Sequence, residues 1–351
     1  MKASYHKYIL DFKRPSGTSR GVLTQKETWF IILEHDNKIG IGECGLLRGL
    51  SIDDRDDYQE TLKWACENID LGIEKLWTAL TEFPSIQFGL ETAFLSLESD
   101  NPFEIFVSDF TKGLKSIPIN GLVWMGEKEF MKAQIQEKIT QGFSCIKLKI
   151  GAIDFDNELE LLSFIRSNFD ADEIEIRVDA NGAFDTTNAL YKLTQLTGFD
   201  IHSIEQPIKQ KQPDSMSELC KTTPLPIALD EELIGVFSYL EKEALLERIR
   251  PQYIILKPSL IGGFKGTKEW ITIAEKHNIG WWITSALESN IGLNAIAQFT
   301  FLQNSAMPQG LGTGGLYTNN IGCPLVVEKG ELCYDVNQKW ELPSLLKVLG
   351  F

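Results

Sequence analysis

The chain has 351 residues, a length typical of two domains or of one large barrel with an appendage. Its formal net charge of −15 argues against nucleic acid or an anionic membrane as a partner, because such binding needs clustered Lys and Arg. No secretory signal and no apolar run of membrane-spanning length is present, and the six cysteines lack CxxC spacing. We therefore expect a cytoplasmic protein with reduced thiols. The sequence does not indicate whether the protein is a monomer or an oligomer.

Residues 1–112 have the pattern of an antiparallel sheet followed by helices. Segments 4–13 and 27–45 are rich in β-branched and aromatic residues, and a hairpin signal lies at 35–40. Residues 14–25 look like a polar loop between them. Helical patterns follow at 53–69, 72–83 and 84–99, with Pro84 at a helix start. This order predicts an α+β domain.

Residues 113–320 alternate short apolar runs with helical patterns. The runs are 117–125, 145–151, 173–182, 201–207, 227–232, 253–259, 280–289 and 307–315. Eight βα units at this pitch predict an α/β fold, a (β/α)7β TIM-like barrel. An open doubly wound sheet is the alternative, but the first run is not followed by the glycine-rich loop usual there. Residues 321–351 again look hairpin-like, and we expect this segment to return to the first domain.

Polar residues stand at the ends of nearly all these runs, where a barrel brings them to one mouth. In chain order they are Lys147, Lys149, Asp179, Asn181, Glu205, Asp230, Glu231, Lys257, Ser285, Ser289, Gly312 and Thr313. Taken singly, most have simpler explanations: Asp179 as a helix N-cap, or the K-x-K strand as surface charge on an edge. Five successive polar strand ends at barrel spacing favour a functional site instead.

Three of these residues, Asp179, Glu205 and Asp230, are carboxylates on consecutive strands, and they would repel one another unless a cation lay between them. Mg²⁺ prefers such oxygen ligands, and Mn²⁺ can take its place. Lys149 and Lys257 would flank the metal from opposite sides of the mouth. A lysine of lowered pKa beside a metal can take the proton next to a carboxylate, while the metal stabilises the enediolate.

The motifs KLK (147–149), VDAN, IEQP, ALDE and LKPS resemble the enolase superfamily, in its muconate-lactonising subgroup, over essentially the full chain. The resemblance implies an α+β capping domain on the barrel. It implies Lys149 and Lys257 as catalytic lysines, with Lys147 beside Lys149. It also implies Asp179, Glu205 and Asp230 as Mg²⁺ ligands, which agrees with the charge argument.

Within the subgroup, TSALESNIGL (284–293) and QGLGTGGLY (309–317) most resemble the o-succinylbenzoate synthases, lyases of menaquinone biosynthesis. That resemblance implies dehydration of a small carboxylate, 2-succinyl-6-hydroxy-2,4-cyclohexadiene-1-carboxylate, to 2-succinylbenzoate. Lys149 would take the α-proton, Lys257 would act as a cation, and the loop bearing Arg20 would close over the substrate. Contacts to substrate are expected from Lys147, Asn181, Ser285, Ser289, Gly312, Thr313 and Arg20, with Glu231 supporting the metal ligands.

Several alternatives remain at this point. A dipeptide epimerase or N-succinylamino acid racemase on the same scaffold would use both lysines for proton transfer. Residues 308–320 contain no acidic side chain, which counts against a substrate with a free ammonium group. Muconate cycloisomerisation has no positive feature in its favour. A non-catalytic binding protein should have lost a ligand or a lysine, and none is missing.

Overall fold

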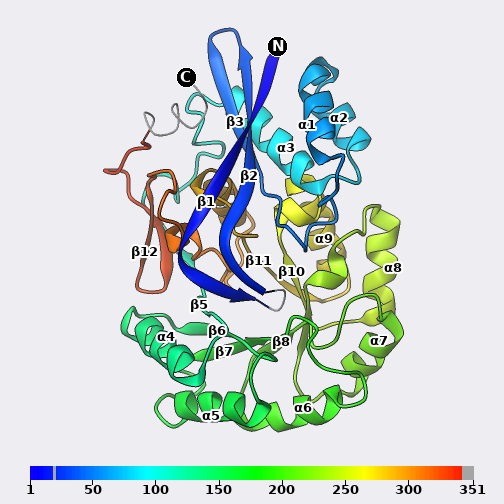
Figure 1. The fold of residues 1–351 in the computed structure, drawn as a ribbon, viewed down its shortest axis with the longest axis vertical. Helices are drawn as coiled ribbons and strands as arrows, with labels where there is room; N and C mark the ends of the chain where they lie inside the picture. Colours follow the sequence, from blue (N-terminus) through cyan, green and yellow to red (C-terminus); the bar gives the residue numbers. More distant parts are fainter. Residues whose placement is uncertain (19–20, 342–351) are drawn as a thin grey trace.

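The computed structural model describes residues 1–18 and 21–341, and it places an N-terminal β-rich domain over one end of a βα barrel (Figure 1). The N-terminal sheet has the antiparallel order β1 (Lys2–Thr18), β2 (Gly21–His35) and β3 (Lys38–Cys44). Three helices follow: α1 (Tyr58–Glu67), α2 (Ile73–Ala79) and α3 (Pro84–Glu98). The predicted α+β arrangement is therefore present in this part of the chain.

Helix α3 lies directly on β3, and glycines make this close approach feasible. A Cβ added to Gly42 would lie 1.9 Å from the carbonyl oxygen of Gly89, and one added to Gly40 would lie 2.2 Å from that of Ala93. Only a residue without a side chain fits between the strand and helix backbones there. The GIGEC segment of β3 is thus held against the domain's main helix.

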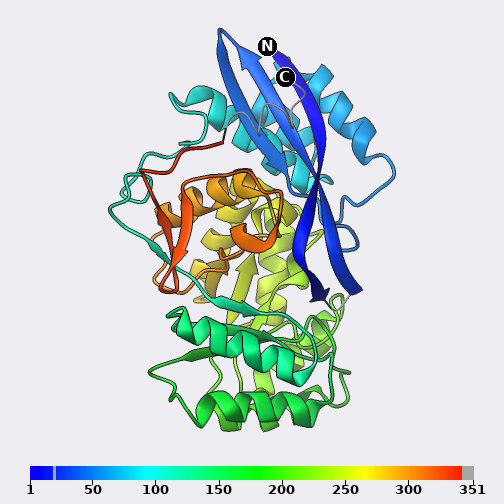
Figure 2. The same ribbon diagram turned by 60° about the vertical axis from the view of Figure 1, so that its left-hand side comes forward.

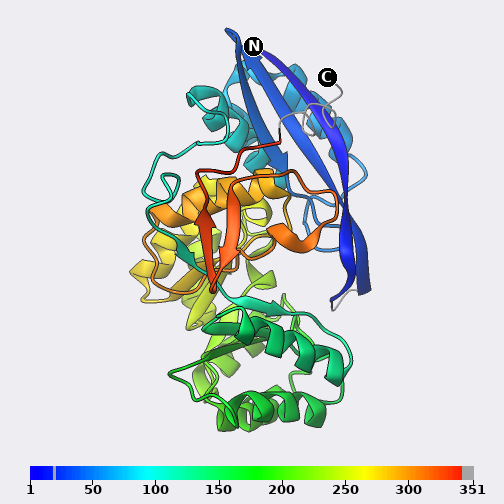
Figure 3. The ribbon, with the colours of Figure 1, turned by 90° about the vertical axis from the view of Figure 1, so that its left-hand side faces the viewer.

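Strands β1 and β2 run further than the sequence indicated. The expected polar loop at 14–25 is largely strand, since Ser16 pairs with Leu23 and Thr18 with Gly21, after a register shift between Asp11 and Ser16. Backbone pairing across the hairpin outweighs the polar, glycine-containing composition that indicated a loop. The long hairpin extends past the sheet and down over the barrel (Figure 3).

The barrel is built on a parallel sheet of seven strands in the spatial order β11-β10-β9-β8-β7-β6-β5. The strands are β5 (Gly121–Val123), β6 (Cys145–Lys149), β7 (Glu175–Asp179), β8 (Ser203–Glu205), β9 (Ile227–Leu229), β10 (Tyr253–Leu256) and β11 (Gly280–Ile283). The helices that follow them are α4 (Lys128–Thr140), α5 (Phe155–Arg166), α6 (Ala189–Leu196), α7 (Pro213–Thr222), α8 (Tyr239–Ile249), α9 (Gly263–Lys276) and α10 (Asn290–Leu302). Seven βα units in succession confirm the α/β fold.

Two residues close the barrel where an eighth strand was expected. The amide of Gly310 donates to the carbonyl of Ile283 at 2.8 Å, next to β11. On the other side, the amide of Asn120 donates to the carbonyl of Gln309 at 2.9 Å, next to β5. The eighth position is therefore occupied by a two-residue bridge, which completes the (β/α)7β arrangement.

The strand pattern of β6 is explained by its two faces. Ile146 and Leu148 are fully buried in the main hydrophobic core, together with Ile135 of α4 and Leu161 of α5. Because side chains alternate along a strand, Lys147 and Lys149 lie on the other face, inside the barrel. Parallel pairing then sets Lys149 beside Asp179 at the strand ends.

The C-terminal hairpin, β12 (Leu325–Glu328) and β13 (Glu331–Tyr334), does not join the N-terminal sheet. It pairs instead with β4 (Ile117–Pro118), at the start of the barrel region (Figure 2). Beyond the hairpin, Trp340 stacks on Phe103 with ring centroids 4.3 Å apart. Within the hairpin, Tyr334 of β13 packs edge-on against Phe110, with ring centroids 5.8 Å apart. The described part of the C-terminal segment therefore contacts the N-terminal domain without joining its sheet. Among the described residues no helix combines the length and apolarity needed to cross a membrane.

Candidate active site

A cleft of about 1030 Å³ lies at the C-terminal ends of the barrel strands, beneath the β1–β2 hairpin. The barrel contributes nine residues that the sequence singled out: Lys147, Lys149, Asp179, Asn181, Glu231, Lys257, Ser285, Gly312 and Thr313. The N-terminal domain contributes the hairpin residues Lys13–Ser16 and Leu23, and the segment Leu47–Leu50. Strand ends converge here because parallel strands in a barrel all point the same way.

Lys149 is held at the mouth by two hydrogen bonds. Its Nζ donates to Asp179 Oδ2 at 3.0 Å and to Asn181 Oδ1 at 2.7 Å. Asn181 has a positive φ of 43°, and its own amide donates to Asp179 Oδ1 at 3.0 Å. The turn after β7 therefore folds back so that one carboxylate and one amide orient the Nζ of Lys149.

Lys147 lies deeper and contacts two carboxylates. Its Nζ is 3.0 Å from Asp179 Oδ2 and forms a second ion pair with Glu205 Oε2. Burial would lower the pKa of Lys147, but the charges of Asp179, Glu205 and Asp230 outweigh it and raise that pKa above its usual range. The surrounding carboxylates therefore favour the positively charged form of Lys147, beside Lys149.

The carboxylates are strongly perturbed by their surroundings. Burial raises the pKa of Glu205 well above its usual range, and the negative charge of Asp179 adds to the effect. For Asp179 burial acts in the same direction, but Lys147, Lys149 and Lys257 outweigh it and lower its pKa. The opposite directions follow from position, because Asp179 lies among the three lysines whereas Glu205 lies between the charges of Asp179 and Asp230.

The donor set fits a hard divalent cation. Asp179, Glu205 and Asp230 are all 2 % exposed or less, on adjacent strands. Glu205 Oε1 is buried and has no hydrogen-bond partner among the described residues. A buried, unsatisfied carboxylate oxygen is costly, and coordination by a metal would satisfy it. Oxygen ligands of this kind are those that Mg²⁺ and Mn²⁺ prefer.

Lys257 lies on the other side of the mouth, at the end of β10, where it forms an ion pair with Asp230 Oδ2. Burial would lower its pKa, but Asp230, Glu205 and Glu231 outweigh it and raise the pKa of Lys257. Strands β6 and β10 are separated by three strands of the barrel, so Lys149 and Lys257 approach the cleft from opposite sides. A small substrate in the cleft would lie between the two lysine side chains.

Gln206 is a supporting residue that the sequence reasoning missed. It is fully buried with a positive φ of 40°, and its Oε1 accepts the amides of Asp230 and Glu232 at 3.2 and 3.3 Å. Its Nε2 donates to Glu232 Oε2 at 3.1 Å. Gln206 thus ties the end of β8 to the turn after β9 and fixes the spacing of Glu205 and Asp230. The EQP motif contained this signal, but only its glutamate was used.

Two loops that form part of the cleft wall are joined by side chains. The hydroxyl groups of Ser285, after β11, and Thr313, in the last loop, are 2.6 Å apart. Gly312 lies in the same wall. Asn181 Nδ2 donates to Glu231 Oε1 at 3.1 Å, which links the turns after β7 and β9. Each of these residues therefore lies at the cleft, as the spacing of the strand ends suggested.

One of the residues predicted to contact the substrate does not line the cleft. Ser289 is fully buried and does not line the cleft; its hydroxyl donates to Glu43 Oε2 of β3 at 2.5 Å. Its hydrogen-bonding capacity is directed at the N-terminal domain, so a contact with substrate is not supported. Arg20 lies outside the described residues. Arg14 and Arg48, which line the cleft, were not predicted from the sequence.

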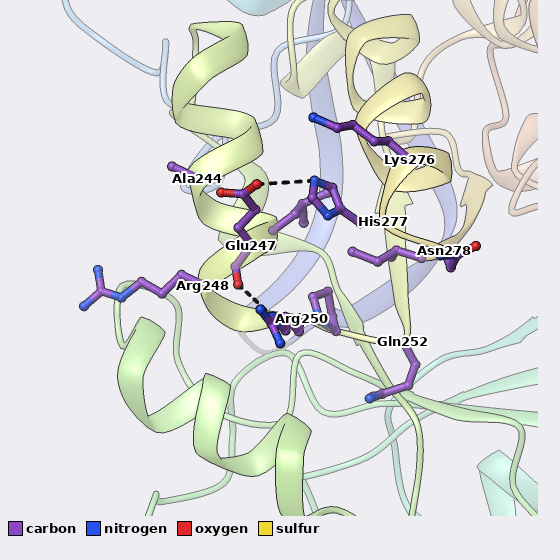
Figure 4. Close-up of a pocket in the computed structure, with 11 residues that line it drawn as sticks. Ala244, Glu247, Arg248, Arg250, Gln252, Lys276, His277 and Asn278 are labelled. Atoms are coloured by element: carbon purple, nitrogen blue, oxygen red, sulfur yellow. Dashed lines mark hydrogen bonds and ion pairs between the residues drawn. The ribbon is translucent and has the colours of Figure 1, made fainter.

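A second hollow of about the same volume lies at the opposite end of the barrel, between the ends of α8 and α9 (Figure 4). Its charged residues include Glu247, Arg248, Lys276 and His277. The His277 Nε2 is 3.8 Å from a carboxylate oxygen of Glu247. No residue predicted from the strand ends lies here.

Comparison with known proteins places the chain among relatives with this architecture. Residues 130–330 match the model of the family described as enolase C-terminal domain-like. The chain belongs to that family. It is 49% identical to an o-succinylbenzoate synthase of Desulfotalea psychrophila (strain LSv54 / DSM 12343), with 95% of this chain and 98% of that protein aligned. The chain therefore belongs to the same family as that synthase, and like it is an enzyme.

Solved structures agree with this placement. The crystal structure of MenC from Desulfotalea psychrophila LSv54 superposes with a TM-score of 0.85 at 45% identity, covering 95% of this chain and 99% of that one. A muconate lactonizing enzyme from Pseudomonas fluorescens, complexed with muconolactone, gives a TM-score of 0.81 at 22% identity, covering 99% and 98% of the two chains. At that lower identity the likeness concerns the fold alone. The suspected superfamily and subgroup are confirmed.

Proposed function

We propose that this enzyme is a lyase that dehydrates 2-succinyl-6-hydroxy-2,4-cyclohexadiene-1-carboxylate to 2-succinylbenzoate, a step of menaquinone biosynthesis. The observation that carries the proposal is 49% identity over 95% of the chain to a protein named o-succinylbenzoate synthase. The buried lysine and carboxylate cluster at the mouth supports it, because that cluster has the groups this elimination requires.

We assign the metal to Asp179, Glu205 and Asp230. The unsatisfied Glu205 oxygen and the raised pKa of Glu205 support a site for Mg²⁺, or for Mn²⁺ in its place. When bound, the cation would supply positive charge at the substrate carboxylate and make the neighbouring C–H bond more acidic. Lys147 would add a fixed positive charge on the same side.

We assign proton transfer to Lys149. Its Nζ would take the proton from the ring carbon that bears the carboxylate, and the electron pair of that C–H bond would remain on the substrate. The C–O bond to the ring hydroxyl at the adjacent carbon then breaks. The same Nζ returns the proton to the departing hydroxide, so water leaves and the ring becomes aromatic. One lysine suffices because the proton and the hydroxide leave from the same face.

Lys257 would act as a cation on the opposite face and stabilise negative charge as it develops in the ring. Its ion pair with Asp230 and its raised pKa support a protonated side chain. Ser285, Thr313, Gly312 and Asn181 would form the wall against which the substrate carboxylates lie. Gly312 suits such a position because a glycine lets a ligand approach the backbone.

A direct assay tests the proposal. The purified enzyme with Mg²⁺ and the cyclohexadiene substrate should form 2-succinylbenzoate, followed by the change in ultraviolet absorbance on aromatisation. Parallel reactions should contain an L-dipeptide and an N-succinyl-L-amino acid in ²H₂O. Deuterium incorporation into either compound, without formation of 2-succinylbenzoate, would replace the dehydration by an epimerase or racemase activity.

A further inference from the structure

A buried charged cluster joins the N-terminal domain to the loop after β11. Its acidic members are Glu43, at the end of β3, and Glu288, just before α10; both are fully buried. Lys26 of β2 is 3 % exposed, and its Nζ has no hydrogen-bond partner among the described residues. Three ionisable side chains removed from water at a domain interface need a structural or functional reason, because their desolvation is costly.

Glu43 receives four hydrogen bonds, three of them from the barrel. Its carboxylate accepts the amide of Ser289 at 2.8 Å, the hydroxyl of Ser289 at 2.5 Å and the amide of Gly292 at 2.8 Å. The fourth donor is the hydroxyl of Thr28 in β2, at 2.7 Å. Ser289 is the N-cap of α10, so a carboxylate from one domain satisfies the free amides at a helix start in the other.

Two glycines pack closely around these bonds. A Cβ added to Gly292 would lie 2.8 Å from Glu288 Cβ and 2.9 Å from Glu43 Oε2. A Cβ added to Gly45, two residues after Glu43, would lie 2.9 Å from Glu288 Cγ. Gly292 therefore packs against both glutamates and Gly45 packs against Glu288, at positions where a side chain would not fit.

The loop that Glu43 anchors is part of the cleft wall. Ser285, Ala286 and Leu287 all line the cleft. Leu287 has a φ of 64°, a left-handed conformation that is strained for a bulky side chain. Such a conformation persists only where its surroundings enforce it.

The bonds that enforce it are visible on both sides of Leu287. Glu288 Oε2 accepts the amide of Ala286 at 2.7 Å, and the hydroxyl of Tyr317 donates to the carbonyl of Leu287 at 2.7 Å. Glu43 fixes the next point along the chain, at Ser289. Removing that anchor would let the strained loop relax, and Ser285 would move with it.

We propose that Glu43 is a positioning residue, which holds residues 284–289 in the conformation that binds the substrate and thereby makes the active site dependent on the N-terminal domain. The inference rests on the proposed function, because its main readout is the dehydration. A substitution at Glu43 should act on substrate binding through the loop, although Glu43 itself does not line the cleft.

The chain offers a matched control. Glu91 of α3 also crosses to the barrel, where it accepts the amides of Phe264 and, at 3.0 Å, of Lys265 at the start of α9. Neither of those two residues lines the cleft. Glu91→Gln therefore weakens the same kind of contact between the same two domains without reaching the substrate wall.

The test compares Glu43→Gln with Glu91→Gln by steady-state kinetics at saturating Mg²⁺. The glutamine side chain in Glu43→Gln keeps one oxygen acceptor but places an NH₂ group against donors. We expect KM to rise about tenfold with kcat within about threefold, because a displaced binding loop weakens substrate contacts. Glu91→Gln should leave KM within about twofold. A merely structural role for Glu43 would lower the active fraction, and so kcat, without moving KM; that result, or equal rises in KM for both variants, overturns the proposal.

A milder variant decides the matter if Glu43→Gln does not fold. Ser289→Ala removes one of the four donors and leaves the carboxylate, so KM should rise about threefold. An unchanged KM would contradict the positioning role. Hydrogen exchange of the peptide covering 284–292 provides a readout without activity: it should be faster in Glu43→Gln, or in Ser289→Ala, than in Glu91→Gln. If the wild type forms no 2-succinylbenzoate but this exchange difference is seen, the proposed function fails while the anchoring of the loop stands.

Discussion

The two ends of the barrel both carry a charged hollow of about 1030 Å³, yet only one has the properties of an active site. At the mouth, the side chains of Lys149 and Lys257 are 14 % and 13 % exposed, and their carboxylate partners are almost fully buried. At the opposite end, the side chains of Lys276 and Glu247 are 59 % and 56 % exposed. Exposed ion pairs are screened by water and contribute little, whereas buried ones shift pKa values and restrict geometry.

The volume and the charge of a hollow therefore do not identify the active site. The burial of its charged side chains, and the direction from which they enter the hollow, do. At the mouth, the lysines and carboxylates extend from the strand ends into the barrel interior, where they form ion pairs with one another. The helix ends deliver their charges to the opposite hollow from outside, where water solvates them. If this difference in burial is a difference in function, substitutions at the mouth should lower activity and substitutions at the opposite end should not.

The largest effect is expected for Lys149→Ala. Loss of the group that takes and returns the proton should lower kcat at least about 10³-fold, with an unchanged circular dichroism spectrum. The matched variant at the opposite end, Lys276→Ala, should keep kcat within about twofold. Comparable losses in the two variants would remove the distinction between the two ends.

The value of kcat should depend on a positive charge at position 257 more than on the amine group itself. We expect Lys257→Ala to lower kcat about 10²-fold, whereas Lys257→Arg, which keeps a cation, should lose about tenfold or less. Both follow from steady-state assays of the dehydration. If the arginine variant is as poor as the alanine variant, Lys257 transfers a proton, and the runner-up activities gain support.

Binding of Mg²⁺ should stabilise the folded protein through Glu205. At a hundredfold excess over Kd the free energy of unfolding should rise by about 2.7 kcal/mol, measured by denaturant titration with and without the ion. Glu205→Gln should lose this increase. Without metal, the same variant should be more stable than the wild type, because one of three crowded carboxylates is gone. A retained response to Mg²⁺ would contradict the assigned ligand set.

A smaller effect concerns Asp53, a buried carboxylic acid away from the mouth. Burial raises its pKa to about 6, although Ser85 donates to it from its amide and its hydroxyl. The native state thus binds this proton more tightly than the unfolded chain does, and the free energy of unfolding falls as pH rises from about 4 to about 6.

Relative to Asp53→Asn, the wild type should lose on the order of 2 kcal/mol across that range in chemical denaturation. Asp54 provides the comparison. Burial acts to raise its pKa, but bonds from Gly49 and Arg48 outweigh it and lower that pKa. Asp54→Asn should therefore change the pH dependence in the opposite direction. Slopes of the same sign would show that the local environment does not control these acids.

Much of the fold and of the candidate site could be predicted from the sequence, because in a βα barrel the spacing of residues along the chain determines where they lie around the mouth. Asp179, Glu205 and Asp230 recur every 25 or 26 residues, and parallel strands then bring them to one level. The alternation of Ile146, Lys147, Leu148 and Lys149 likewise determined which side chains face the core. The extent of the β1–β2 hairpin could not be deduced in this way, because cross-strand pairing decided it.

The sequence by itself determined which residue types stand at the strand ends and in what order, since local patterns and regular spacing suffice for that. Only the tertiary structure decided that Ser289 faces Glu43 and not the cleft, and that Gln206 fixes the spacing of two carboxylates. Ser289 and Glu43 are 246 residues apart in the chain. No local pattern encodes such a contact, because it arises where two separately patterned domains pack and each buried polar group must find its partner.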